Sequence, residues 1–152
     1  MKFAIYTLLI AAAATGAQAI TPGKWSTTGK TVDFQMQMPP GVPASVVDMI
    51  KSRMAGQSYS SSQCITRDDI DKAPEKMFSE SNGQCKYDRF DMSGGKLDAV
   101  ASCKMQGVRM RMEMTGTHTD TTFQTRMKMT GDGDMGPMTI ISEGSGTRTG
   151  DC

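Results

Sequence analysis

The sequence predicts a mainly β protein: an antiparallel meander of about seven strands that forms a curved sheet or partly closed barrel, with one helix inserted after the first strand. Apolar and polar residues alternate with a period of two from Gly107 to Thr130, which indicates half-buried strands. Other short alternating runs are separated by turn-forming residues, which is typical of sequential antiparallel strands. Only the run 44–55 spaces its apolar residues as a helix does.

The first nineteen residues have the pattern of a signal peptide. Lys2 is followed by an apolar run over 3–14 and by Ala17-Gln18-Ala19, an A-x-A cleavage signal. The apolar run is shorter than the roughly 20 residues that a membrane-spanning helix needs. We therefore expect cleavage after Ala19, a periplasmic or secreted protein, and a single disulfide-bonded β-rich domain over 20–152. No transmembrane segment is predicted in this mature part.

The elements before the first hairpin follow from local signals. Residues 23–38 alternate as a long first strand, which Pro39 ends because proline cannot donate to a ladder. The helix over 44–55 starts after Pro43 and is followed by Gly56. A serine-rich strand is expected over 57–65, with the character of an edge strand. Thr66 to Asp69 resembles a capping box that opens a short helical turn, which Pro74 interrupts.

The four cysteines predict two disulfides, because their count is even and the chain has an export signal. Two strands flank Ser93-Gly94-Gly95, a turn signal. A three-residue loop there, with Met92 paired to Lys96, sets Cys85 opposite Cys103, within reach of a slightly twisted disulfide. Cys64 and Cys152 then pair with each other and tie the C-terminus to the early part of the domain.

The methionine-rich run over 107–130 is predicted to form a hairpin with a four-residue loop over 118–121. This register sets Glu113 opposite Arg126, although it leaves Arg111 against Lys128, whereas a two-residue loop over 118–119 would oppose like charges twice. It places Met112 across from Met127 and Met110 across from Met129. A glycine-aspartate loop over 130–136 and a last strand over 138–148 complete the sheet. Trp25, the only tryptophan, is expected in the core or as a plug at one end of the barrel.

The order of these motifs resembles DUF3617, a family of small exported bacterial proteins of unknown function. The motifs are Pro22-Gly23-Lys24-Trp25, Cys64-Ile65-Thr66, the Cys85 and Cys103 hairpin, Met-Gly-Pro-Met at 135–138, and the ending Arg148-Thr149-Gly150-Asp151-Cys152. The resemblance covers essentially all of the mature chain. It departs at the helix over 44–55, where a looser segment rich in methionine and proline is expected. The resemblance implies export and a shared fold, and it carries over no catalytic residue.

Methionine invites two interpretations. The chain has 15 methionines and three leucines, so methionine must fill much of the interior, where it packs as a flexible, polarizable side chain. The alternative is a Cu(I) site, because thioether sulfur is a soft ligand. Its candidate ligands are Met110, Met112, Met127, Met129 and His118. Core packing accounts for the pattern without a metal, so no cofactor is predicted.

Charge and composition restrict the function further. Removal of Lys2 leaves 16 basic and 16 acidic residues, and this neutral mature chain has no basic patch for nucleic acid. With one histidine and bridged cysteines, no catalytic constellation is expected, and we do not predict an enzyme. A binding module for a hydrophobic ligand or an envelope partner is the first hypothesis. A methionine-rich copper or oxidant-buffering protein and a structural envelope protein without a small ligand are the alternatives.

Overall fold

The computed structural model describes residues 19–72, 74, 85–105, 107–133 and 136–152. The predicted signal peptide lies outside the described residues except for Ala19. The described part has seven strands and two helices, with these bounds: β1 Gly23–Met36, α1 Ala44–Met54, β2 Ser58–Ile65, α2 Arg67–Lys72, β3 Cys85–Asp91, β4 Lys96–Met105, β5 Val108–His118, β6 Thr122–Gly133 and β7 Gly136–Gly150.

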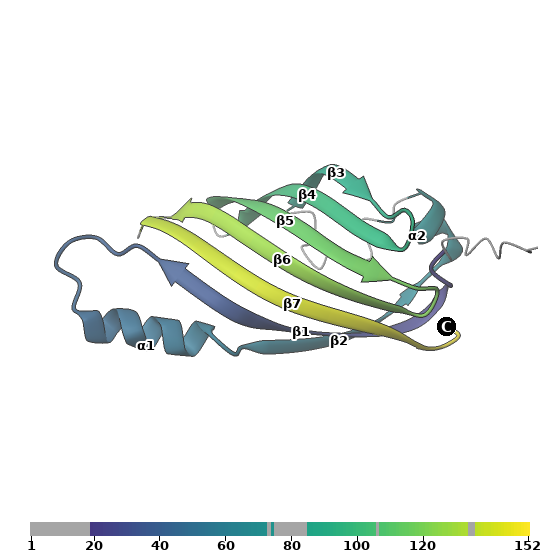
Figure 1. Cartoon of the computed structure of the whole chain (residues 1–152), viewed down its shortest axis with the longest axis horizontal. Helices are drawn as coiled ribbons and strands as arrows, with labels where there is room; N and C mark the ends of the chain where they lie inside the picture. The colour runs from purple at the N-terminus through teal and green to yellow at the C-terminus, as the bar shows by residue number, and fades with distance from the viewer. Residues whose placement is uncertain (1–18, 73, 75–84, 106, 134–135) are drawn as a thin grey trace, which may run out of the picture.

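The strands form one antiparallel sheet in the order β2-β1-β7-β6-β5-β4-β3. Strands β3 to β7 form a meander, as predicted. Strand β7 then pairs with β1, the first strand of the chain, and β2 pairs with the other edge of β1. The sheet is twisted and curved, and it stays open because its two edge strands, β2 and β3, do not meet (Figure 1). The mainly β fold class is confirmed, as is the helix after the first strand.

The two helices lie at opposite ends of the molecule and have different local causes (Figure 1). Helix α1 begins after Pro43 and ends before Gly56, whose φ of 80° suits glycine. Helix α2 starts at the predicted capping box. The Thr66 hydroxyl accepts from the Asp69 amide at 3.2 Å, and the Asp69 carboxylate accepts from the Thr66 amide at 2.9 Å.

The register of the methionine hairpin differs from the prediction by two residues. Met112 lies opposite Met129 and Met114 lies opposite Met127. The four residues between the last paired positions are 119–122 in place of the predicted 118–121. Thr119 explains the shift: its hydroxyl accepts from the backbone amide of Thr122 at 3.0 Å and closes the turn there. The faces of both strands are as predicted, since a two-residue shift keeps the period of two.

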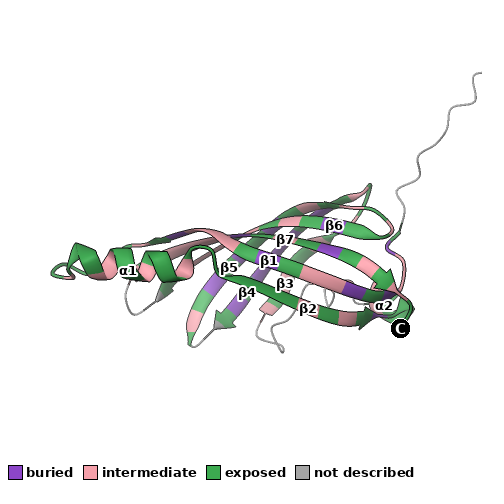
Figure 2. Cartoon of the chain, turned by 90° about the horizontal axis from the view of Figure 1, so that it is seen from below, coloured by how far each residue is buried: buried purple, intermediate pink, exposed green. Residues whose placement is uncertain are grey.

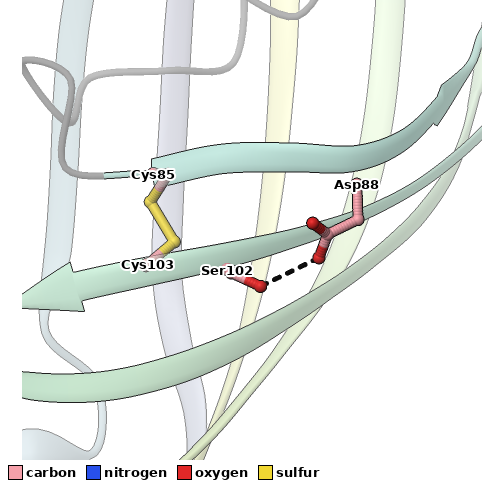
Figure 3. Close-up of a disulfide and its surroundings, with 4 residues drawn as sticks. All are labelled: Cys85, Asp88, Ser102 and Cys103. Atoms are coloured by element: carbon pink, nitrogen blue, oxygen red, sulfur yellow. Dashed lines mark hydrogen bonds between the residues drawn. A yellow bond between two sulfur atoms is a disulfide. The ribbon is translucent and has the colours of Figure 1, made fainter.

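The β3–β4 hairpin contains the predicted disulfide and a β-bulge that was not predicted. Cys85 pairs with Cys103, and their sulfurs are bonded at 2.05 Å (Figure 3). The register then shifts between Tyr87 and Arg89, so the predicted pairing of Met92 with Lys96 is wrong. Asp88 lies at the bulge, and its carboxylate accepts a hydrogen bond from Ser102 at 2.8 Å (Figure 3).

The bulge has a clear packing reason. One extra residue reverses which side chains of β3 point to each face of the sheet. Tyr87 and Cys85 point to the apolar face before the bulge, and Phe90 does so after it, where it pairs with Ala99. Without the bulge, Arg89 would take that place. Tyr87 and Phe90 instead meet edge to face, with ring centroids 5.4 Å apart.

Strands β6 and β7 extend into the predicted loop over 130–136, of which residues 134–135 lie outside the described residues. A loop was expected over 130–136, but the β6–β7 ladder continues through Asp132 opposite Pro137 to Gly133 opposite Gly136. Strand β7 is correspondingly longer than the predicted 138–148 at both ends. Gly136, the first residue of β7, has a φ of 104°, a conformation that favours glycine.

Candidate functional site

One face of the sheet, which we call the apolar face, carries the core and most of the described methionines. Its side chains continue from strand to strand in register. One row across five strands is Phe34 on β1, Ile140 on β7, Met129 on β6, Met112 on β5 and Ala101 on β4. The alternation seen in the sequence therefore becomes a continuous apolar surface, as a pleated sheet requires.

The methionines of the apolar face become less buried from β5 toward β1. On β5, Met110 and Met112 are 6% exposed and Met114 is 4% exposed. On β6, β7 and β1 the methionines are only half-buried, although Met127, Met129 and Met138 pack against the same cluster as Met110 and Met112. We call these half-buried residues the methionine strip: Met36, Met127, Met129 and Met138. Figure 2 shows buried residues on β4 and β5 and also on β1 and β7, where residues other than methionine are buried.

The four Cu(I) candidate methionines belong to one packed cluster, whereas His118 lies apart from it. Met112 faces Met129, whereas Met110 faces Gly131. His118 lies eight residues along β5 from Met110, a distance of about 26 Å at the usual rise of a strand. The methionine pairs are thus separated from the only imidazole. Within the described residues, no group of three or more His, Cys, Asp and Glu side chains could hold a metal ion.

His118 belongs instead to the end of the sheet near the β5–β6 turn. It lies opposite Phe123, and its backbone amide donates to the carbonyl of Gly95 at 2.9 Å. Both ring nitrogens are buried and have no hydrogen-bond partner among the described residues.

Aromatic rings close the same end of the apolar face. Trp25 is fully buried, as predicted, and stacks on Phe123 with ring centroids 5.8 Å apart. Phe123 covers Gly146, where an added Cβ would lie 2.2 Å from the ring. Tyr59 covers Gly29 in the same way, at 2.4 Å. These glycines leave the space that flat rings occupy, a feature that alternation alone did not predict.

The opposite, polar face has a shallow groove of about 1020 Å³. Its walls are two rows of side chains that cross the sheet, and its floor is the backbone of the row between them, including Gly29 and Gly144. Arg126 and Glu143 form an ion pair in one wall. Hydroxyl groups dominate the other wall, where Thr28 and Ser145 lie 3.2 Å apart. This groove was not predicted from the sequence, because its floor forms only where Gly29 and Gly144 lie opposite each other in the folded sheet.

Cys64 and Cys152 are exposed thiols in the structure. They lie close together, since Lys24 pairs with Cys64 on one side and with Gly150 on the other. The pKa of Cys152 is raised, mainly by a hydrogen bond with the Cys64 thiol and to a smaller extent by desolvation. The two sulfurs are thus neighbours, and their disulfide stays a prediction.

Among the described residues, no helix is both long enough and apolar enough to cross a membrane. Comparison with known proteins gives one match. The model of a family described as "Protein of unknown function (DUF3617)" matches residues 20–152. No curated protein and no solved structure matches the chain. The chain belongs to this family, whose match starts at the residue that the predicted cleavage would expose.

Proposed function

We propose that this member of the DUF3617 family is an exported binding module, and that its methionine strip takes the acyl chain of a lipid-like ligand. The observation that carries the proposal is the incomplete burial of this strip. Met127 and Met129 belong to the same packed cluster as Met110 and Met112, yet they stay half-exposed. An apolar surface left partly open on a small protein commonly marks a binding site.

The chemistry of the strip suits an elongated, flexible ligand. Methionine has three rotatable bonds and a polarizable sulfur, so a strip of methionines adjusts its shape to different chains. The open sheet supports this use, because no further strand of the described residues covers the apolar face at β1 and β7. The signal-peptide pattern supports a place in the cell envelope, where acyl chains are abundant.

A fluorescent fatty acid, cis-parinaric acid, tests the proposal. Met138→Lys places a charge in the strip, whereas Thr139→Lys places the same charge next to it on the polar face. We expect the first variant to weaken binding about tenfold or more, because burying a charge beside an acyl chain costs over 1.4 kcal/mol. The second should bind as the wild type does. Circular dichroism of both variants checks that they fold.

Absence of saturable binding by the wild-type protein, or equal loss in both variants, would contradict the proposal. Native mass spectrometry of protein released from the envelope gives an independent outcome. A bound mass of lipid size agrees with the proposed function. Bound copper would favour the metal alternative, and a bare chain that also fails to bind parinaric acid would favour a structural role.

A further inference from the structure

The two edge strands of the open sheet differ in how they are protected against pairing. Strand β3 has a β-bulge and four charged residues, which are common devices against edge-to-edge association: Lys86, Asp88, Arg89 and Asp91. Strand β2, Ser58–Ile65, has no charged residue and no proline, and its register with β1 runs without a shift. An edge with neither charge nor bulge is a ready template for another strand.

We propose that β2 pairs antiparallel with β2 of a second copy of this chain, so that two open sheets become one continuous sheet in a two-fold dimer. This surface is separate from the methionine strip, and the inference does not depend on the proposed function. A two-fold interface must be complementary to itself. A strand of neutral hydroxyl-bearing residues satisfies this condition, since no like charges meet when it is paired with its own copy.

Symmetry restricts the register. Directly opposed residues of an antiparallel pair point to the same face of the sheet. Even and odd residues of β2 point to opposite faces, and a two-fold axis perpendicular to the sheet keeps these faces in the second copy. Two opposed residues must therefore both be even or both be odd. The registers with most overlap put Ser61 or Ser62 on the axis. In the first, Ser60 faces Ser62 of the partner subunit, and in the second, Ser62 faces Ser62 of the partner subunit. Either register pairs hydroxyl groups on the polar face.

The helices beside β2 favour a second copy over an unrelated extended chain. Helix α1 precedes β2 and ends with the basic residues Lys51 and Arg53. Helix α2 follows β2 and has Asp68 and Asp69 in its first turn after Arg67, with Asp68 paired to Lys72. Antiparallel pairing sets the start of one β2 beside the end of the other. It therefore brings the basic end of α1 toward the acidic start of the partner's α2, at both ends of the interface.

Helix α1 also lacks cover within its own chain. It has no buried residue (Figure 2). Its Met49 is 46% exposed. Its apolar side chains Val46, Val47 and Ile50 are only half-buried. Helical stability in proteins comes mostly from packing an amphipathic face against other elements. A partner beside β2 supplies such a surface close to α1.

Sedimentation velocity over a range of protein concentrations tests the inference. We expect the wild-type protein to sediment as a dimer at high concentration. The variant S60K/S62K places lysines opposite each other in both registers, so its dissociation constant should rise about tenfold or more. Gln124→Lys is the matched control, since Gln124 is an exposed residue of an interior strand on the same face. This control should dimerise as the wild type does.

A mixture distinguishes repulsion at the interface from a folding defect. S60E/S62E should also be monomeric alone. Mixing it with S60K/S62K should restore a dimer containing one copy of each, because each lysine that faced a lysine then faces a glutamate. A wild-type protein that is monomeric at every concentration would overturn the inference and leave the edge to a chain of another sequence. A dimer that survives in S60K/S62K, or a mixture that stays monomeric, would overturn it as well.

Discussion

The packing of Phe123 over Gly146 makes a specific prediction about stability. Gly146 has no side chain, and an added Cβ would lie 2.2 Å from the Phe123 ring, closer than any real contact. The ring cannot simply move aside, since it is 4% exposed and stacks on the fully buried Trp25. Gly146→Ala must therefore displace Phe123 from its place in the core.

The magnitude follows from what the displacement removes. Loss of the aromatic stack costs about 0.5–1.5 kcal/mol, and loss of a large part of the ring's burial costs about 1–2 kcal/mol more. We expect Gly146→Ala to lower the free energy of unfolding by about 2–3 kcal/mol, although alanine is otherwise favoured over glycine in a strand by roughly 0.5–1 kcal/mol. Urea denaturation with the disulfide intact measures the loss.

A double-mutant cycle separates this cause from a general backbone effect. In a Phe123→Ala background the ring is gone, so Gly146→Ala should become neutral or slightly stabilising. The coupling free energy between the two sites should then be about 2 kcal/mol or more. If Gly146→Ala costs as much without the ring as with it, or costs less than about 0.5 kcal/mol in the wild type, the steric explanation is refuted.

Three further predictions concern other parts of the chain. Met112→Ala should cost about 2–5 kcal/mol and Met112→Leu less than about 1.5 kcal/mol in the same urea assay, because leucine nearly keeps the buried volume; equal costs would contradict a packing role. Peptide mapping of the unreduced protein should find Cys64 bonded to Cys152. In reduced protein Cys64→Ala should speed alkylation of Cys152, because the hydrogen bond that raises its pKa is removed; unchanged alkylation would argue against this contact. Thr66→Ala should cost about 1 kcal/mol through loss of the cap of α2, measured against Thr147→Ala, an exposed threonine of β7.

The sequence was sufficient where a local pattern decides the structure. Alternation identified the apolar faces of β5 and β6, and the capping box identified the start of α2. Each of these two depends on residues close together in the chain, so one stretch of sequence contains the whole cause. Cys85 was also predicted opposite Cys103, but there the wrong pairing of Met92 with Lys96 and the unpredicted bulge at Asp88 offset each other by one residue.

The sequence was insufficient where distant or competing interactions decide. The hairpin register depends on the Thr119 hydroxyl, which several nearby threonines could have replaced. The bulge at Asp88 exists because Phe90, and not Arg89, must face the core. The pairing of β1 with β7 has no local signal, since Trp25 and Arg148 are opposed only in the folded sheet. The polar groove follows from that long-range pairing and was missed for the same reason.

The place of β1 in the sheet also determines when the protein can finish folding. Strand β1 is synthesised first, yet one of its edges is completed only by β7, which is synthesised last. Arg148 Nε, for example, donates to the Pro22 carbonyl at 2.8 Å across 126 positions of sequence. Pairings of such high contact order form slowly, because a long loop must close before they contribute. An incomplete chain therefore presents an unpaired edge of β1, and the native sheet can assemble only after the last strand has been released.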